Sequence, residues 1–163
     1  LRASLKRDYS KIAREWAYQN VPRRIIAEEY ISELGNDDLL DYKMYSFHGE
    51  PKLTVVCSDR FSKTGTRMNF YDIDWEPMGI HFGHYPPLPT EFPKPATYEE
   101  MKRLTAELSK DCPFLRVDFY EIKGRLFIGE LTFFPGAGFE KFRPMSKDYE
   151  LGEWLHLETV HRG

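Results

Sequence analysis

The chain has 163 residues, of which 41% are hydrophobic and 15% aromatic, and its formal net charge is −3 at pH 7. This length and composition predict one folded domain with a substantial core and exclude a disordered chain. The charge gives no electrostatic reason to expect a nucleic-acid or membrane-surface partner. Two cysteines do not make a disulfide framework or a zinc site, and no apolar run is long enough to form a membrane span. We therefore expect a cytoplasmic protein without a membrane span.

The first half of the chain predicts one helix followed by strands. Apolar side chains recur at helical spacing over 4–18, with Lys and Arg between them, which is typical of an amphipathic helix, and Pro22 ends it. RIIAEEYI (24–31) has the pattern of a mostly buried strand. The remaining patterns predict a hairpin of 41–47 and 51–61 around His48-Gly49, and a further strand over 67–75.

The second half predicts a long loop, a helix, a hairpin and a short helix. Six prolines lie within 76–96, and a loop of this length inside a domain is often functional. Thr97 and Glu100 form a capping-box pattern that opens a helix. The hairpin covers 115–133, and the last helix lies near 147–157. These elements predict an α+β fold, in which helices pack on an antiparallel sheet of hairpins.

The predicted hairpin over 115–133 carries polar residues in otherwise apolar strands. Side chains alternate between the two faces along each strand. The apolar residues of both strands therefore lie on one face only if the two residue numbers of each cross-strand pair sum to an even number. A two-residue turn at Lys123-Gly124 fails this test, whereas a three-residue loop over 122–124 with a left-handed Gly124 satisfies it. The apolar face then includes Phe127, Leu131 and Phe133, and the polar face unites Arg116, Asp118, Glu130 and Thr132.

Two carboxylates on one polar face have two interpretations. They repel each other unless a cation lies between them, and hard oxygen ligands suit Mg²⁺. Arg116 beside them has the donor geometry to hold a phosphate. Alternatively, the face is only solvated and its charges pair with one another. The residues alone leave both interpretations open.

The order of these motifs along the chain resembles that of ATP-grasp proteins. The motif sequences themselves most resemble those of the TupA-like ATP-grasp family. Arg116-Val117-Asp118, then Glu130-Leu131-Thr132, then Pro135-Gly136 resemble the metal-binding end of that fold. IIAEEYI (25–31) resembles the adenine-binding hinge strand, and 41–60 resembles the hairpin that ends in a phosphate-facing Arg. The resemblance runs from about residue 20 to about residue 157.

The resemblance implies roles for individual residues. Asp118 and Glu130 would bind one or two Mg²⁺ ions, with ATP as co-substrate, and Thr132 stands where the family commonly has a metal-binding Asn. If Phe47 lies opposite Glu50, Lys43 shares a face with Asp41, Ser58 and Arg60. The implied catalytic cations are Arg116, Lys43 and Arg60, and the implied nucleotide contacts are Glu28, Glu29, Ile31, Asp41 and Lys43.

The resemblance also implies a function. MgATP would phosphorylate a carboxylate, and the acyl phosphate would pass to an amine, in cell-wall teichuronopeptide or other surface-polysaccharide biosynthesis, beside other enzymes of that pathway. Because no glycine-rich clamp with its lysine precedes residue 24, we expect 1–163 to be a single C-terminal portion of such a ligase. The alternatives are a non-catalytic module that binds nucleotide or sugar, a glycosyltransferase-associated protein, and a plain structural domain.

Several other residues have weaker patterns. His81 and His84 have a metal-like spacing, but two histidines without further ligands more often lie in a polar loop. Arg67 and Asn69 are candidates for a phosphate contact and equally ordinary strand residues. PGAG (135–138) offers backbone N–H groups to an anion or forms a plain turn. Cys57 and Cys112 are expected to fill the core.

Overall fold

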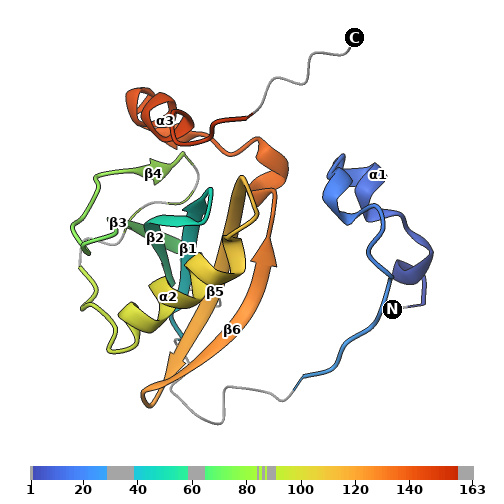
Figure 1. Ribbon diagram of the computed structural model, residues 1–163, viewed down its shortest axis with the longest axis horizontal. Helices are drawn as coiled ribbons and strands as arrows, with labels where there is room; N and C mark the ends of the chain where they lie inside the picture. Colours follow the sequence, from blue (N-terminus) through green and yellow to red (C-terminus); the bar gives the residue numbers. More distant parts are fainter. Residues whose placement is uncertain are drawn as a thin grey trace.

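A computed structural model describes residues 2–28, 39–58, 65–83, 85, 87 and 91–157. Its main body is a five-stranded sheet of order β3-β2-β1-β5-β6, in which all neighbouring strands are antiparallel (Figure 1). The strands are β1 (Asp41–Phe47), β2 (Glu50–Ser58), β3 (Arg67–Asp72), β5 (Phe114–Ile122) and β6 (Arg125–Thr132). With helices packed on this sheet, the predicted α+β class is confirmed.

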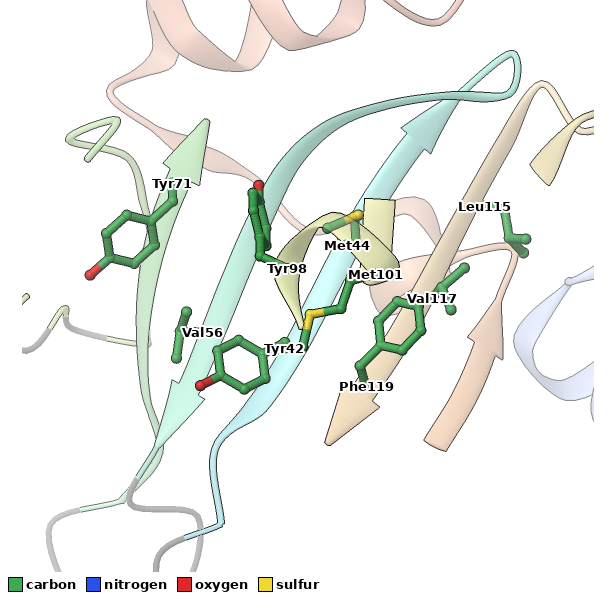
Figure 2. Close-up of a cluster of buried hydrophobic side chains, with 9 residues drawn as sticks. All are labelled: Tyr42, Met44, Val56, Tyr71, Tyr98, Met101, Leu115, Val117 and Phe119. Atoms are coloured by element: carbon green, nitrogen blue, oxygen red, sulfur yellow. The ribbon is translucent and has the colours of Figure 1, made fainter. Parts of the chain in front are cut away.

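One face of the sheet packs against α2 (Tyr98–Ser109), which crosses the strands (Figure 1). Figure 2 shows Tyr98 and Met101 of this helix gathered with side chains from β1, β2, β3 and β5. Because alternate strand residues point to the same side, β1 and β5 contribute every second residue to this cluster, and β2 and β3 contribute one residue each. Its strand members are Tyr42, Met44, Val56, Tyr71, Leu115, Val117 and Phe119.

The opposite face is covered over only part of its width. A two-stranded sheet of β4 (His81–Phe82) and β7 (Phe142–Arg143) lies there with α3 (Met145–Gly152). They pack on a second cluster that includes Tyr45, Val55, Phe70 and Leu151. Towards β5 and β6, the same face carries charged side chains instead. This uncovered part positions the candidate site.

The β5–β6 hairpin reaches the predicted polar face by a different route. Ile122 lies opposite Arg125, so the turn is the two-residue Lys123-Gly124, with φ angles of 51° and 73°. The residue numbers of this pair sum to an odd number, and the predicted three-residue loop is therefore wrong. Between Phe119 and Asp118, however, the register shifts past Gly129, and beyond this bulge Asp118 pairs with Glu130.

The bulge also divides the apolar residues of β6 differently from the prediction. Phe127 pairs with Tyr120, which places it on the polar side of the sheet, whereas Leu131 pairs with Val117 on the helix side. The prediction that Phe127 and Leu131 share a face is therefore wrong. At the bulge itself, a Cβ atom on Gly129 would lie 2.7 Å from Cε2 of Tyr120. The ring of Tyr120 thus occupies the space that any larger residue at position 129 would need.

We expect the Gly129→Ala change to lower the free energy of unfolding by about 1–3 kcal/mol, because the added methyl group overpacks the bulge against Tyr120. Urea denaturation of the variant and the wild type measures the difference. Gly152→Ala is the matched control, since nothing lies within 4 Å of a Cβ atom built there. Equal effects of the two changes would show that the close contact at the bulge has no energetic weight.

The β1–β2 hairpin contains a similar register shift. Phe47 lies opposite Glu50 as predicted, but the register shifts between Ser46 and Tyr45, so Lys43 pairs with Val55. Alternation then places Ser58 on the α2 face, together with Val56, and Lys43 on the other face. The prediction that Ser58 shares a face with Lys43 is wrong. Arg60 lies outside the described residues.

The N-terminal segment differs most from the predictions. Instead of one helix over 4–18, the structure has short pieces: 3₁₀ turns η1 (Ser4–Lys6) and η2 (Trp16–Tyr18), and α1 (Tyr9–Ala13), which ends at a left-handed Arg14. Residues 24–28 form no strand and are exposed, so the predicted buried strand is wrong over this range. A strand needs a partner for its backbone groups, and no described segment pairs with 24–28. Glu29 and Ile31 lie outside the described residues.

Two smaller predictions concern α2 and the cysteines. The helix begins after Thr97 as predicted, but the capping box does not form: Glu121 Oε2 accepts hydrogen bonds from the Thr97 backbone N–H (2.9 Å) and hydroxyl (2.6 Å). Cys57 is buried, Cys112 packs against the cluster under α2, and neither cysteine is in a disulfide. Within the described ranges, no helix is long and apolar enough to cross a membrane.

Candidate functional site

Three neighbouring strands bring six polar residues together on one face of the sheet, which we call the polar face. The cross-strand pairs that align them are Lys43 with Asp118, and Asp118 with Glu130. Directly paired residues of antiparallel strands place their side chains on the same side. The polar face consists of Asp41 and Lys43 from β1, Arg116 and Asp118 from β5, and Glu130 and Thr132 from β6.

Asp118 is the centre of the polar face. The residue is only 2% exposed, and both of its carboxylate oxygens accept hydrogen bonds from cations. Oδ2 lies 2.5 Å from Lys43 Nζ and 2.8 Å from Arg116 Nη2, and Oδ1 lies 2.7 Å from Arg116 Nε. Such charge-assisted bonds offset the desolvation of a buried carboxylate, and a fork of two bonds from one Arg also fixes its orientation.

The two cations of the polar face remain charged. Lys43 also donates to Asp41 Oδ2 at 2.7 Å. Burial lowers the pKa of Lys43, but the charges of Asp118 and Asp41 and their hydrogen bonds outweigh it and raise the pKa above its usual value. Burial likewise lowers the pKa of Arg116, and its hydrogen bonds with Asp118 more than compensate, so this pKa is also raised. A phosphate group would therefore meet two fixed positive charges here.

Glu130 and Thr132 offer the oxygen atoms that are least engaged. The Glu130 side chain is 61% exposed, and its Oε2 lies 3.6 Å from Arg116 Nη2. Thr132 is only 8% exposed, and its hydroxyl oxygen has no hydrogen-bond partner in the described part of the chain. A buried hydroxyl without a partner costs free energy, so it marks a place where a ligand atom would be favourable.

These donors fit a magnesium ion that is shared with phosphate groups. Mg²⁺ in nucleotide sites is usually held by one or two carboxylates together with substrate phosphates. Glu130 and the Thr132 hydroxyl are available for this, whereas Asp118 would contact an ion only by exchanging Lys43 or Arg116 for it. Among the described residues, no three or more His, Cys, Asp or Glu side chains are grouped to hold a metal by themselves.

An open cavity of about 620 Å³ borders the polar face. Its wall on one side is β6 with the 3₁₀ turn η4 (Pro135–Gly138), and on the other the N-terminal segment. Tyr18 holds this segment in place: its hydroxyl accepts a hydrogen bond from the Phe133 N–H at 3.1 Å, and its ring makes edge contacts with Phe133 and Phe134. The charged residues that line the cavity are Glu15, Arg116 and Glu130.

Glu15 is the site residue that the sequence analysis missed. Glu15 lies within the segment predicted as an amphipathic helix, where a charged residue is ordinarily solvated. In the structure it is only 4% exposed. The local sequence offered little signal, because Glu15 lies between Arg14 and Trp16 in REWAY (14–18), and Trp16 is 75% exposed.

The structure does not bring the other predicted residues to the polar face. Glu28 lies exposed in the segment without a strand. Arg67 and Asn69 are aligned with Tyr71 and Val56 on the α2 face. His81 lies in β4 opposite Arg143, and His84 is outside the described residues. The PGAG segment is the turn η4, in which Gly136 and Ala137 both have a φ of 55°. The roles of Glu28, Glu29, Ile31 and Arg60 remain predictions.

Comparison with known families gives one match. A model of the family described as TupA-like ATPgrasp matches residues 1–156. The match therefore includes the N-terminal segment that lines the cavity, whereas the motifs alone suggested a start near residue 20. Searches of curated proteins and of solved structures found no match. Because the family match covers nearly the whole chain, the protein belongs to the TupA-like ATP-grasp family.

Proposed function

We propose that the protein binds MgATP on its polar face and acts in an ATP-dependent ligation of a carboxylate to an amine through an acyl phosphate. The observation that supports this most strongly is the pairing of Asp118 with Glu130 beside two cations, Lys43 and Arg116, whose side chains are each 13% exposed. Family membership supports the nucleotide and the class of reaction. Phosphoryl transfer depends mainly on positioning and on charge neutralisation, and these groups offer both.

The polar face would change its pairing when nucleotide binds. In the structure, Lys43 and Arg116 both donate to Asp118. A phosphate oxygen is an equally good acceptor for either cation, and an Arg fork suits its geometry. We propose that Lys43 and Arg116 turn part of their hydrogen bonds to phosphate, and that the released Asp118 oxygen joins Glu130 in holding Mg²⁺ beside Thr132. When bound, Mg²⁺ would neutralise charge on the β- and γ-phosphates.

The remaining assignments rest on the family alone. We propose Asp41 as a ribose contact, Glu28, Glu29 and Ile31 as the adenine wall, and Arg60 as a further phosphate contact. We also propose that the chain is the C-terminal portion of a longer cytoplasmic ligase, that the acceptor acid belongs to cell-wall or surface-polysaccharide biosynthesis, and that other enzymes of that pathway are its partners.

A second candidate function is nucleotide binding without catalysis. It is favoured by one observation: Asp118 is already satisfied on both oxygens by Lys43 and Arg116, as in a closed structural ion cluster. Such a cluster needs no metal to be stable. If it does not rearrange, the polar face would hold phosphate groups only weakly through Glu130 and Thr132 with Mg²⁺, and phosphoryl transfer would not follow.

We expect the Glu130→Gln change to abolish the Mg²⁺-dependent part of ATP binding while leaving the fold intact. Glu130 is largely exposed and its ion pair with Arg116 is long, so its loss costs little stability. Isothermal titration with ATP, in the presence of Mg²⁺ and of EDTA, measures the metal-dependent part. Glu107→Gln, at an exposed position on α2, is the control. If Glu130→Gln retains the full metal-dependent affinity, the assignment of Glu130 is wrong.

A further inference from the structure

The cavity beside the polar face is lined by a further carboxylate, that of Glu15 in the N-terminal segment. Glu15 is 4% exposed, and within the described residues its carboxylate makes no hydrogen bond or ion pair. Burial raises the pKa of Glu15. A buried, unpaired carboxylate is unfavourable unless it is protonated or meets a cation. Arg14 precedes Glu15 in the sequence, and Arg116 lines the same cavity. Neither forms an ion pair with the Glu15 carboxylate in the described structure.

A buried hydroxyl belongs to another residue that lines the same cavity. The Thr132 hydroxyl lines the cavity and has no hydrogen-bond partner among the described residues, although Thr132 is more than nine-tenths buried. An N–H donor from a ligand would satisfy this oxygen. Glu15 and Thr132 come from opposite walls of the cavity, the N-terminal segment and β6. A carboxylate and an unsatisfied hydroxyl that line one cavity suit a ligand that donates several hydrogen bonds.

The rest of the lining favours an organic cation. Tyr9 and Tyr18 line the cavity with their ring centroids 5.7 Å apart, and aromatic rings attract ammonium groups. Loss of solvent raises the pKa of the Tyr9 hydroxyl, and the charges of Glu15 and Glu130 raise it further, so both carboxylates act on this space. A strongly hydrated Mg²⁺ ion would gain less from an aromatic wall.

The one positive charge in the lining is already balanced. Arg116 lines the cavity, but its guanidinium donates two hydrogen bonds to Asp118 and faces Glu130 at 3.6 Å. With all its carboxylates ionised, the polar face together with Glu15 has four negative and two positive side chains, which leaves two negative charges. This surplus would attract an incoming cation, and the phosphates of ATP would bind to Lys43 and Arg116 only together with Mg²⁺.

We infer that this cavity binds the protonated amine substrate, with the ammonium group between Glu15 and the Thr132 hydroxyl and its carbon chain against Tyr9 and Tyr18. The inference rests on the proposed function in taking an amine as the second substrate. It places that amine beside the polar face on which the acyl phosphate would form. The volume of about 620 Å³ is in the range of small-molecule sites. Glu15 is thus assigned as the anchor of the amine.

Three probes of similar shape and different charge test the inference. Phenethylamine, 2-phenylethanol and 3-phenylpropanoate are titrated into the isotopically labelled full chain, and NMR shifts are followed. We expect saturable binding of the amine alone, with the shifts centred on Tyr9, Glu15 and Tyr18. Binding of the alcohol or the acid as tightly as the amine would overturn the inference. Displacement of the amine by Mg²⁺ alone would overturn it as well, because the site would then be a metal site.

Variants locate the anchor. We expect Glu15→Gln, which keeps the shape of the side chain, to weaken phenethylamine binding about tenfold or more, because it removes a charge-assisted hydrogen bond. Thr132→Val should weaken binding less, and Glu107→Gln should leave it unchanged. NMR spectra of each variant confirm that it folds. Unchanged affinity in a folded Glu15→Gln variant would overturn the inference.

The same samples separate this inference from the proposed function. Titration with MgATP is repeated on the wild type and on Glu15→Gln. Binding of MgATP together with failure of the amine to bind overturns the amine site and leaves the proposed function standing. Binding of the amine without binding of MgATP supports the cation site and contradicts the proposed function.

Discussion

The Asp118→Asn change is expected to lower the free energy of unfolding by about 3–5 kcal/mol, because it removes one partner of a buried ion cluster. Asp118 is 2% exposed and accepts from both Lys43 and Arg116. An amide has the same shape but carries no charge, and one of its two polar atoms is a donor that would face these cations. Among the described residues, the two partly buried cations Lys43 and Arg116 would then have Asp41 and Glu130 as their remaining carboxylate partners.

Urea denaturation of Asp118→Asn beside Asp111→Asn isolates the effect of the cluster. Asp111 is exposed and makes no interaction in the described structure, so its change should stay within about 0.5 kcal/mol. A loss of less than about 1 kcal/mol for Asp118→Asn would show that the cluster is better solvated than its burial indicates.

The Lys43→Met change has the second large expected effect. Lys43 lies between Asp41 and Asp118, both nearly fully buried, and its ammonium donates to each carboxylate. Methionine fills a similar volume but leaves the two carboxylates without the cation between them. We expect a loss of about 3 kcal/mol or more in the free energy of unfolding, and a marked loss of MgATP affinity, since Lys43 is a proposed phosphate contact.

A double-mutant cycle checks the origin of this effect. If the cost of Lys43→Met comes from the stranded charge of Asp118, the pair Lys43→Met and Asp118→Asn should cost clearly less than the sum of the single changes. Lys141→Met, at an exposed position, controls for adding an apolar surface residue. Strict additivity of the two cluster changes would contradict the coupling that the 2.5 Å contact implies.

The polar face was predictable because apolar alternation constrains it. Val117 and Phe119 must face the core, so Asp118 must face the other way, whatever the turn does. The local route was not predictable with the same reasoning. A single unpaired residue, Gly129, restores the register that the two-residue turn at Lys123-Gly124 breaks, and counting parity from the turn alone does not reveal it.

The same kind of shift explains the error at Ser58. The register counted from the pair Phe47 and Glu50 is correct only as far as the irregularity between Ser46 and Tyr45. Beyond it, each β2 residue lies on the face opposite to the one predicted. Glycine within a strand is a recognised sign of a bulge, so Gly129 offered a signal. The β1–β2 shift coincides with Pro51, which lacks the N–H that a regular ladder uses.

The N-terminal segment escaped prediction because its structure depends on distant contacts. Helical spacing over 4–18 describes an amphipathic helix, but the chain turns at the left-handed Arg14, and Tyr18 instead bonds to the backbone of Phe133. A hydrogen bond across 115 positions is invisible to a local pattern. The burial of Glu15 follows from this docking, so the cavity and its anchor emerge only in three dimensions.

The most direct test of the central claim is the position of a metal ion in a crystal of the protein grown with ADP and Mn²⁺. This ion replaces Mg²⁺ and can be located by its anomalous scattering. The proposed function predicts an anomalous peak on the polar face, within about 2.2 Å of a Glu130 carboxylate oxygen, with diphosphate oxygens bonded to Arg116 or Lys43. A bound nucleotide whose metal lies away from both Glu130 and Asp118 would contradict it.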